Sequence, residues 1–157
     1  MHSINKILVP TDFSDNASHA YSYAQKIAGR YGAKVDFIHI IPTLQYFSES
    51  LEQLSMPLDM EQDVYPYAQE RTSGKLKKLM DSYLQPENKG DGIVRIAPNP
   101  SKTIAKYAEQ DNYDLIVLTT HKRNGIKHRI LKSTTEKIVR LSVHPVVTIN
   151  PDLVSAA

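Results

Sequence analysis

The chain of 157 residues contains no cysteine. Disulfides, thiolate catalysis and cysteine-based zinc or iron–sulfur sites are therefore excluded. The six histidines form neither a His-Glu-x-x-His motif nor a His-x₃-His pair, so the sequence gives little support to a metal site. It also lacks the Walker A and Gly-x-Gly-x-x-Gly patterns of common nucleotide-binding proteins. No nucleophile–base pair can be named either, and we expect a protein that is not an enzyme.

Long apolar runs are also absent, and none approaches the roughly 20 residues that span a bilayer. The first residues lack the basic and apolar regions of a signal peptide. A net charge of +2 creates no strong field for nucleic acid or anionic lipid. We therefore expect a cytoplasmic protein that binds neither a membrane nor nucleic acid.

The bulk composition is that of a globular protein, with 41% hydrophobic and 23% charged residues, and the length suits one domain over residues 1–157. Short apolar runs predict buried strands. The expected strands are Lys6–Val9, Lys34–Ile41, Ile93–Ala97, Asp114–Thr119 and Val143–Ile149. The expected helices follow a cap at Ser14, Asp15 or Asn16 and end before Gly32, then cover Tyr67–Leu84, Lys102–Gln110 after Ser101, and a segment from Ser133 or Thr134 to Leu141.

Two further segments have weaker patterns. Gly90-Asp91-Gly92 predicts a turn, and Thr43–Pro66 predicts a long, partly helical connection. Strands that alternate with helices predict a parallel sheet with helices on both faces. Ligands of such sheets bind beyond the carboxyl ends of strands, where the winding direction reverses. We expect any site where Lys6–Val9 and Asp114–Thr119 end.

Polar residues follow the first of these strands, at Pro10-Thr11-Asp12. The carboxylate of Asp12 could accept hydrogen bonds from a ribose or an adenine. It could equally accept the free N–H groups at the start of the next helix. Both roles stay open from the sequence.

The second candidate segment, Thr119–Ser133, carries five Lys/Arg residues and two histidines ahead of a helix N-terminus. Helix N-termini favour anions, and the Ser133 hydroxyl adds a donor. The alternative is a solvated basic loop. The segment lacks interleaved aromatic residues, so stacking on single-stranded nucleic acid is not expected.

Taken together, the order and spacing of these segments resemble the universal stress protein (UspA) family. The resemblance rests on Ile7–Ser14, Asp114–Val117, Thr120-His121, Ser133, Glu136–Val139 and Pro145–Val147. It implies a five-stranded parallel sheet in a Rossmann-like, three-layer sandwich of the adenine nucleotide alpha hydrolase-like type. It also implies a role in stress adaptation and a homodimer.

One branch of that family binds ATP or AMP with a loop of Gly, two residues, Gly, nine residues, Gly, then Ser or Thr. In this sequence the glycine positions hold Thr119, Lys122 and Lys132, and Ser133 alone is kept. Glycine lets a backbone approach phosphates closely, so three side chains there should disturb the phosphate cradle. We expect no tightly bound nucleotide. The alternative is an ATP or AMP site that uses the altered basic loop.

The resemblance and the strand ends together give a set of candidate nucleotide or anion residues. These are Pro10, Thr11, Asp12, Ile40, Thr119, His121, Lys122, Arg123, Lys132, Ser133 and Thr134. His121 matches the family's loop histidine, but a metal role for it has little support.

The last strand has apolar residues on both faces, at Val146, Val147 and Ile149. If it lies at the sheet edge, pairing with a second copy would cover its open hydrogen-bonding groups. The alternative is a strand covered by its own helices and tail. The sequence thus favours a homodimeric stress-response module that acts through unknown protein partners, with a nucleotide-binding stress sensor as the alternative.

Overall fold

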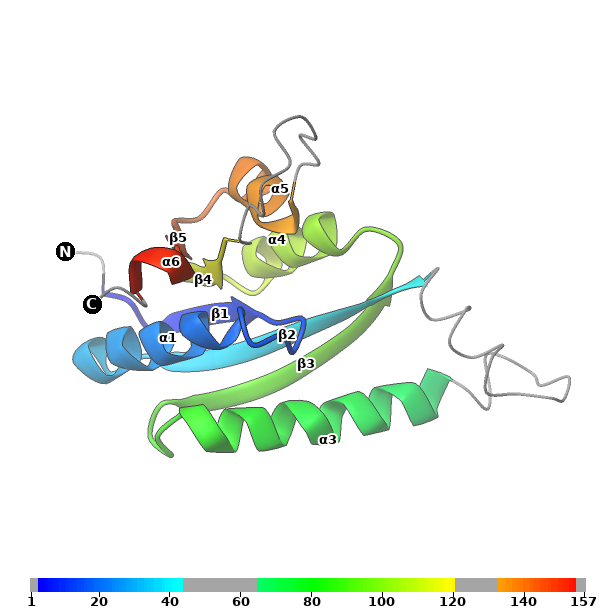
Figure 1. Cartoon of the computed structure of the whole chain (residues 1–157), viewed down its shortest axis with the longest axis horizontal. Helices are drawn as coiled ribbons and strands as arrows, with labels where there is room; N and C mark the ends of the chain where they lie inside the picture. The colour runs from blue at the N-terminus through cyan, green and yellow to red at the C-terminus, as the bar shows by residue number, and fades with distance from the viewer. Residues whose placement is uncertain (1–2, 44–64, 121–132, 155–157) are drawn as a thin grey trace, which may run out of the picture.

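The computed structural model describes residues 3–43, 65–120 and 133–154 of the chain, and its centre is a parallel β-sheet (Figure 1). The sheet has the strand order β3-β2-β1-β4-β5. Each neighbouring pair runs parallel. The strands are β1 (Lys6–Pro10), β2 (Lys34–Pro42), β3 (Lys89–Ala97), β4 (Leu115–Thr119) and β5 (Val146–Ile149).

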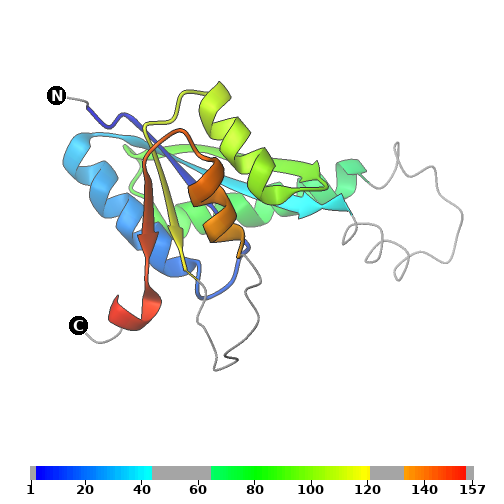
Figure 2. The same cartoon turned by 90° about the horizontal axis from the view of Figure 1, so that it is seen from above.

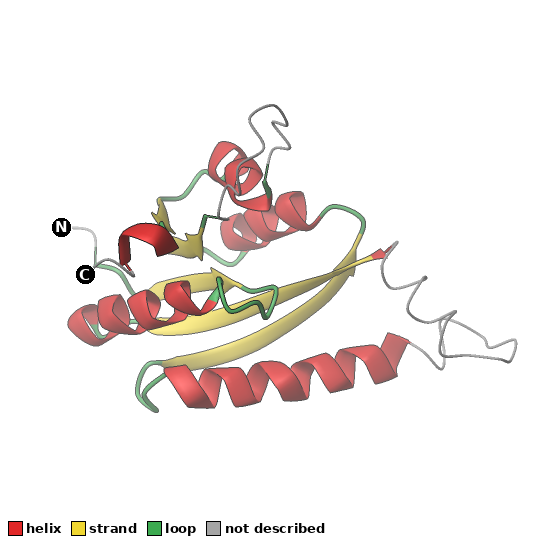
Figure 3. Ribbon diagram, viewed as in Figure 1, coloured by secondary structure: helices red, strands yellow, loops and turns green. Residues whose placement is uncertain are grey.

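Helices cover both faces of the sheet, which confirms the predicted α/β sandwich (Figures 2 and 3). The helices are α1 (Ser18–Tyr31), α3 (Tyr65–Tyr83), α4 (Pro100–Gln110), α5 (Thr134–Leu141) and the short α6 (Pro151–Val154). Helices α1 and α3 pack on one face, and α4 and α5 pack on the other. The sequence analysis did not predict α6. The helices of the described residues include none that is long and apolar enough to cross a membrane.

The inner strand β4, which lies between β1 and β5, shows why the sheet forms here. All five of its residues are buried. Leu115 and Val117 belong to the core beneath α1 and α3, whereas Ile116 and Leu118 belong to the core beneath α4 and α5. A strand that is apolar on both faces needs cover on both, and the helices provide it.

The order of the strands places a topological switch point between β1 and β4. From β1 the chain winds outward through β2 to β3, and it then returns to β4 and continues to β5 on the other side. The carboxyl ends of β1 and β4 therefore flank the position where ligands bind in open α/β sheets. These are the two strands at which the sequence analysis placed a site.

The predicted turn at Gly90-Asp91-Gly92 is wrong, because these residues belong to β3. The register between β2 and β3 shifts at this point, which is the mark of a β-bulge. A Cβ atom on Gly90 would lie 1.8 Å from Asp36 Oδ1. Glycine is needed here because the backbone passes against a buried carboxylate, and the turn-like composition reflects that contact.

Two predicted helix caps also differ from the structure. The N-cap of α1 is Ala17, which makes no side-chain capping bond, so neither Ser14, Asp15 nor Asn16 caps this helix directly. The N-cap of α4 is Asn99, whose Oδ1 accepts a hydrogen bond from the Lys102 N–H, in place of the expected Ser101.

Other boundaries moved less. Gly32 is the C-cap of α1 with a φ of 70°, as predicted. Strand β5 begins at Val146, three residues after the predicted start. Helix α3 begins at Tyr65, within the connection predicted for Thr43–Pro66, and residues 44–64 of that connection lie outside the described residues.

Candidate functional site

The loop after β1 is anchored by Thr11, which is buried. Its N–H donates to the Ile38 carbonyl at 2.9 Å, and its hydroxyl is bonded to the Tyr21 hydroxyl. The same hydroxyl accepts the Phe13 N–H at 2.9 Å. The Thr11 carbonyl lies 2.7 Å from Nδ1 of His39. Thr11 therefore fixes the path of the loop, and its polar groups already have protein partners.

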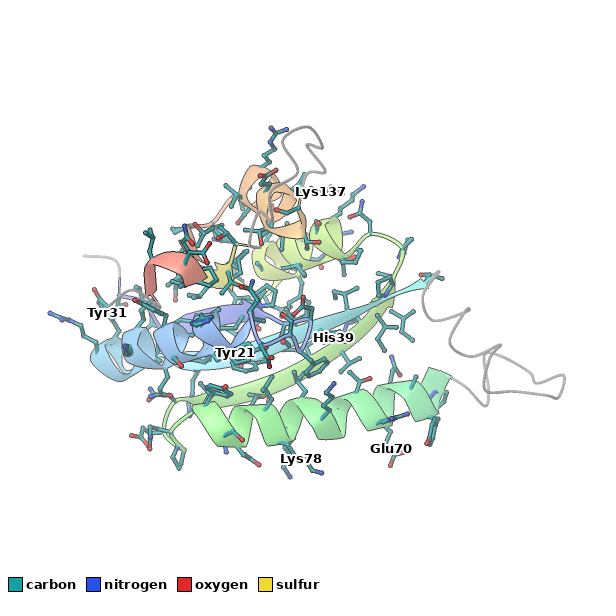
Figure 4. All side chains as sticks on the ribbon, in the orientation of Figure 1. Tyr21, Tyr31, His39, Glu70, Lys78 and Lys137 are labelled. Carbon is teal, nitrogen blue, oxygen red and sulfur yellow. The ribbon has the colours of Figure 1, made fainter. Side chains whose placement is uncertain are left out.

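His39, which extends from β2, lies against this loop (Figure 4). Because a carbonyl only accepts, the proton of the ring lies on Nδ1. Burial lowers the pKa of His39, which opposes the effects of the Thr11 carbonyl and of Asp12. The ring centroid lies 4.6 Å from that of Phe13. A neutral imidazole thus positions the loop.

Phe13 has a left-handed backbone, with a φ of 63°. This conformation is uncommon for a bulky side chain. The Lys75 ammonium of α3 lies 4.3 Å from the ring centroid of Phe13 on a cation–π contact. The contacts with His39 and Lys75 hold the turn, so the loop is joined to both β2 and α3.

Asp12 lies at the surface of the loop, after the half-buried Pro10 that ends β1. Its Oδ1 accepts the Ser14 N–H at 2.9 Å, which forms a local turn. Helix α1 begins only at Ser18, four residues after Ser14. Asp12 therefore closes a turn ahead of the helix and does not cap the helix itself. The exposed carboxylate stands beside the switch point.

The end of β4 is bridged to the loop by Asn16. Its Nδ2 donates to Thr119 Oγ1 at 3.2 Å and to the Thr120 carbonyl at 3.0 Å. The Thr120 N–H donates to the Ile149 carbonyl at 2.9 Å. One side chain thus joins the two strand ends across the switch point.

The start of α5 is tied to the same strand end. Of the two predicted caps, Ser133 and Thr134, the N-cap is Ser133, whose Oγ accepts the Glu136 N–H at 3.1 Å. The Thr135 hydroxyl donates to the Thr119 carbonyl at 2.7 Å. Thr134, the first residue of the helix, is exposed. The helix N-terminus therefore opens beside the carboxyl end of β4.

Several candidate residues are not part of this cluster. His121, Lys122, Arg123 and Lys132 lie outside the described residues. The side chain of Ile40 is buried in the core beneath α4 and α5, where it offers no polar group to a ligand. The described part of the chain holds no group of three or more histidine or acidic side chains that could bind a metal ion.

Strand β5 lies at one edge of the sheet, as the dimer prediction requires. Val146 and Val147 are half-buried, whereas Ile149 lies in the core and its carbonyl accepts the Thr120 N–H, so Ile149 offers a partner neither its side chain nor that carbonyl. The side chain of Thr148 is exposed. Beside the strand is a surface hollow of about 290 Å³, lined by Thr120, Thr135, Glu136, Val139, Arg140 and Thr148.

Sequence reasoning missed three residues of the cluster. Asn16 was considered only as a cap, and His39 and Thr135 were not among the candidate residues. The role of Asn16 could have been predicted from the strand order, because a polar residue just before a helix at a switch point faces the end of the neighbouring strand. The sequence alone did not establish that strand order.

Comparison with known proteins agrees with this architecture. The family model described as "Universal stress protein family" matches residues 3–150. The universal stress protein MJ0577 of Methanocaldococcus jannaschii is 23% identical over 152 residues, covering 92% of this chain and 93% of its own. Its solved structure superposes with a TM-score of 0.73 at 24% identity, covering 95% and 97% of the two chains.

A second solved structure, a universal stress protein in complex with cAMP, superposes with a TM-score of 0.64 at 18% identity. It covers 95% of this chain and 98% of its own. Identity at this level supports the shared fold. The family match, which covers nearly the whole chain, supports more: the chain belongs to the universal stress protein family.

Proposed function

We propose that the protein acts in stress adaptation as a cytoplasmic homodimer that works through protein partners, without catalysis and without tight ATP binding. The observation that carries this proposal is the side chain of Thr119, which is buried where the family's phosphate loop has its first glycine. Its hydroxyl and carbonyl are held by Asn16 and Thr135. A ligand would have to displace these contacts.

The sequence beyond Thr119 points the same way. Lys122 and Lys132 stand at the other two glycine positions. A lysine adds a long side chain where the backbone would need to approach a phosphate closely. Its ammonium group would also occupy space that the phosphates of a bound ATP would need. The residues that favour close phosphate contact are therefore replaced at each of the three positions.

The dimer proposal rests on the open edge of β5. Among the residues that the structure describes, no strand pairs with the outer backbone groups of β5. Apolar side chains are exposed around it, with Val139 47% and Val143 69% accessible. Pairing with a second copy would cover both the edge and these side chains through a symmetric interface.

One observation favours the alternative, a nucleotide sensor. Ser133 caps α5 immediately beside the switch point, and a helix N-terminus in this position attracts anions. The cAMP complex of the structural neighbour shows that a universal stress protein of this fold holds a nucleotide. In this chain Lys122, Arg123 and Lys132 would supply the opposing charge.

Calorimetry with ATP, ADP and AMP on nucleotide-free protein separates the two proposals. Our proposal expects no binding tighter than roughly 10 μM, or about −7 kcal/mol. Tighter binding, or a nucleotide released when the purified protein is denatured, would contradict it. Lys122→Ala combined with Lys132→Ala should then weaken the binding, and unchanged affinity would exclude these side chains from the site.

Light scattering tests the dimer. We expect a dimer at tens of micromolar, dissociated by Val147→Asp and by Thr148→Lys. Thr148 is exposed, so its variant changes the edge without disturbing the core. The control is Tyr67→Asp, at a side chain that is 62% exposed on α3, the helix that packs against β3 at the other edge of the sheet. A monomeric wild type, or a Thr148→Lys variant that stays dimeric, would count against pairing through β5.

A further inference from the structure

We propose that one side of α3 is a docking surface for an acidic segment of a protein partner. We call this side the basic stripe, and it consists of Tyr67, Arg71, Lys75 and Lys78. These residues follow one another at intervals of four, four and three positions, which places them on one side of the helix, and all four are exposed. The proposal rests on the proposed function, since it names the kind of partner through which the module acts.

The positive charges of the basic stripe have no acidic partner in the described part of the chain. The ion pairs found there do not include the stripe. Asp81 follows Lys78 by three residues, but its carboxylate is bonded to Lys89. The Lys75 ammonium lies 4.3 Å from the ring centroid of Phe13, a contact that leaves its charge in place. The stripe therefore offers three positive charges to a partner.

The spacing of these charges opposes the stability of α3 itself. Arg71 and Lys75 are four residues apart, and Lys75 and Lys78 are three apart. Like charges at these spacings repel each other on a helix. Glu70 does not offset the repulsion by pairing within the helix, because no basic residue lies three or four positions from it. Attraction to an acidic partner explains an arrangement that the helix alone does not favour.

The basic stripe stays accessible in the proposed dimer. Helix α3 packs against β3 at one edge of the sheet, whereas the proposed pairing uses β5 at the other edge. Lys78 lies on the outer side of α3 and points away from the sheet (Figure 4). The stripe also ends in Tyr67, and tyrosine and arginine are enriched at protein–protein interfaces. A dimer therefore leaves this surface free for a third protein.

The size of the basic stripe identifies the class of partner. The seven residues from Arg71 to Lys78 cover about 10 Å of helix, a distance that about three extended residues of a partner span. Recognition of anionic lipid draws on about four to eight clustered cations, and nucleic-acid binding on many phosphate contacts. Three cations on a chain of net charge +2 suit a short run of carboxylates instead.

The test uses a fluorescein-labelled peptide of eight glutamates, whose binding to the full chain is followed by fluorescence anisotropy at low salt. The wild type should bind this peptide and should not bind a peptide of eight glutamines. Arg71→Gln, Lys75→Gln and Lys78→Gln combined should weaken the binding about tenfold, because each exposed ion pair contributes a factor of about two. A wild type that does not bind the glutamate peptide would overturn the proposal.

The matched control removes three exposed cations from the opposite face of the sheet. Lys102→Gln, Lys106→Gln and Lys137→Gln combined change the net charge by the same amount on α4 and α5, and should leave the affinity for the peptide unchanged. An equal loss in both triple variants would show attraction to the overall charge and would overturn the basic stripe. Binding to phosphatidylserine vesicles that depends on the stripe, without binding to the peptide, would overturn the choice of a protein partner.

A double variant separates a binding role from a structural one. Arg71→Gln with Lys78→Gln spares the contact between Lys75 and Phe13, and it provides the test if the triple variant does not fold. It should weaken peptide binding about fourfold. Its urea midpoint should equal or exceed that of the wild type, because repulsion along α3 is reduced. A lower midpoint with unchanged peptide affinity would show that the stripe stabilises the fold and does not bind.

The basic stripe and the proposed function fail in different ways. Tight ATP binding by the wild type would contradict the proposed function, whatever the stripe variants do. The stripe is judged by the ratio of peptide affinities between the triple variant and the wild type. An unchanged ratio would remove the stripe and leave the proposed function in place, with its partner bound at another surface.

Discussion

On the amino-terminal side of the sheet a buried carboxylate organises the contacts, whereas the carboxyl ends of β1 and β4 are joined by neutral hydroxyl and amide groups. Asp36 is 4% exposed, and its oxygens accept the Tyr113 hydroxyl and the Asp91 N–H, each at 2.6 Å. Burial and the Asp36 carboxylate raise the pKa of Tyr113, so its hydroxyl remains a donor. The Lys6 ammonium lies 3.9 Å from Asp36.

The two ends of the sheet should therefore differ in how much each contributes to stability and how readily each accepts a ligand. Removing one partner of a buried charged group is costly, because the remaining polar groups lose their partners in a low-dielectric environment. The neutral groups around Asn16, Thr119 and Thr120 can exchange one donor for another at smaller cost. We therefore expect the amino-terminal side to determine stability and the carboxyl ends to tolerate a ligand.

The largest effect should come from Asp36→Ala. It leaves the Tyr113 hydroxyl and the Asp91 N–H without their acceptor, and we expect a loss of about 3 kcal/mol in the free energy of unfolding, measured by urea denaturation. The control is Lys6→Met, because the half-exposed ammonium of Lys6 should contribute less than about 1 kcal/mol. Equal losses for both variants would show that the ion pair, not the hydrogen-bonded carboxylate, stabilises this side.

A smaller effect is expected at the carboxyl end, from Ser133→Ala. The variant removes the acceptor of the Glu136 N–H, and the loss of such a cap costs about 1 kcal/mol. Thr134→Ala is the matched control, since the exposed Thr134 follows directly and is not the cap. Its effect should stay within about 0.5 kcal/mol. A Ser133→Ala loss as large as that of Asp36→Ala would remove the contrast between the two ends.

The same contrast explains which features the sequence predicted. Strand β4 and the cap at Ser133 were predictable, because a run of buried aliphatic residues and a serine three residues before a glutamate are local signals. The pairing of Gly90 with Asp36 was not, because it joins residues from two strands across a bulge. The composition of Gly90-Asp91-Gly92 is typical of a turn, but the close approach of Gly90 to Asp36 places these residues in a strand.

The candidate site likewise has features that the sequence predicted and features that it did not. Its place at the ends of β1 and β4 was expected from the alternation of strands and helices, because ligands of such sheets bind where the winding direction reverses. The contacts of Asn16 and His39 did not follow, since each depends on which strand lies beside its own. Ser133, whose capping role is local, was identified, whereas Asn16 and His39, which each connect two elements, were not.

The smallest effect concerns the support of the loop after β1. Burial lowers the pKa of His39 below its ordinary value of 6.5. In the unfolded chain the imidazole has its ordinary pKa, so as the pH falls below about 6.5 the unfolded state takes up a proton that the folded state resists. His39 therefore favours folding fully above that pH, and its contribution declines as the solution becomes more acidic.

His39→Gln should remove this part of the pH dependence. Glutamine retains an N–H donor for the Thr11 carbonyl but has no proton to gain in this range. Urea midpoints measured at about pH 7.5 and about pH 5.5 should therefore differ less in the variant than in the wild type. The control His19→Gln replaces a histidine of α1 and should retain the wild-type difference. If His39→Gln retains it too, the acid sensitivity arises elsewhere and not from the half-buried imidazole of His39.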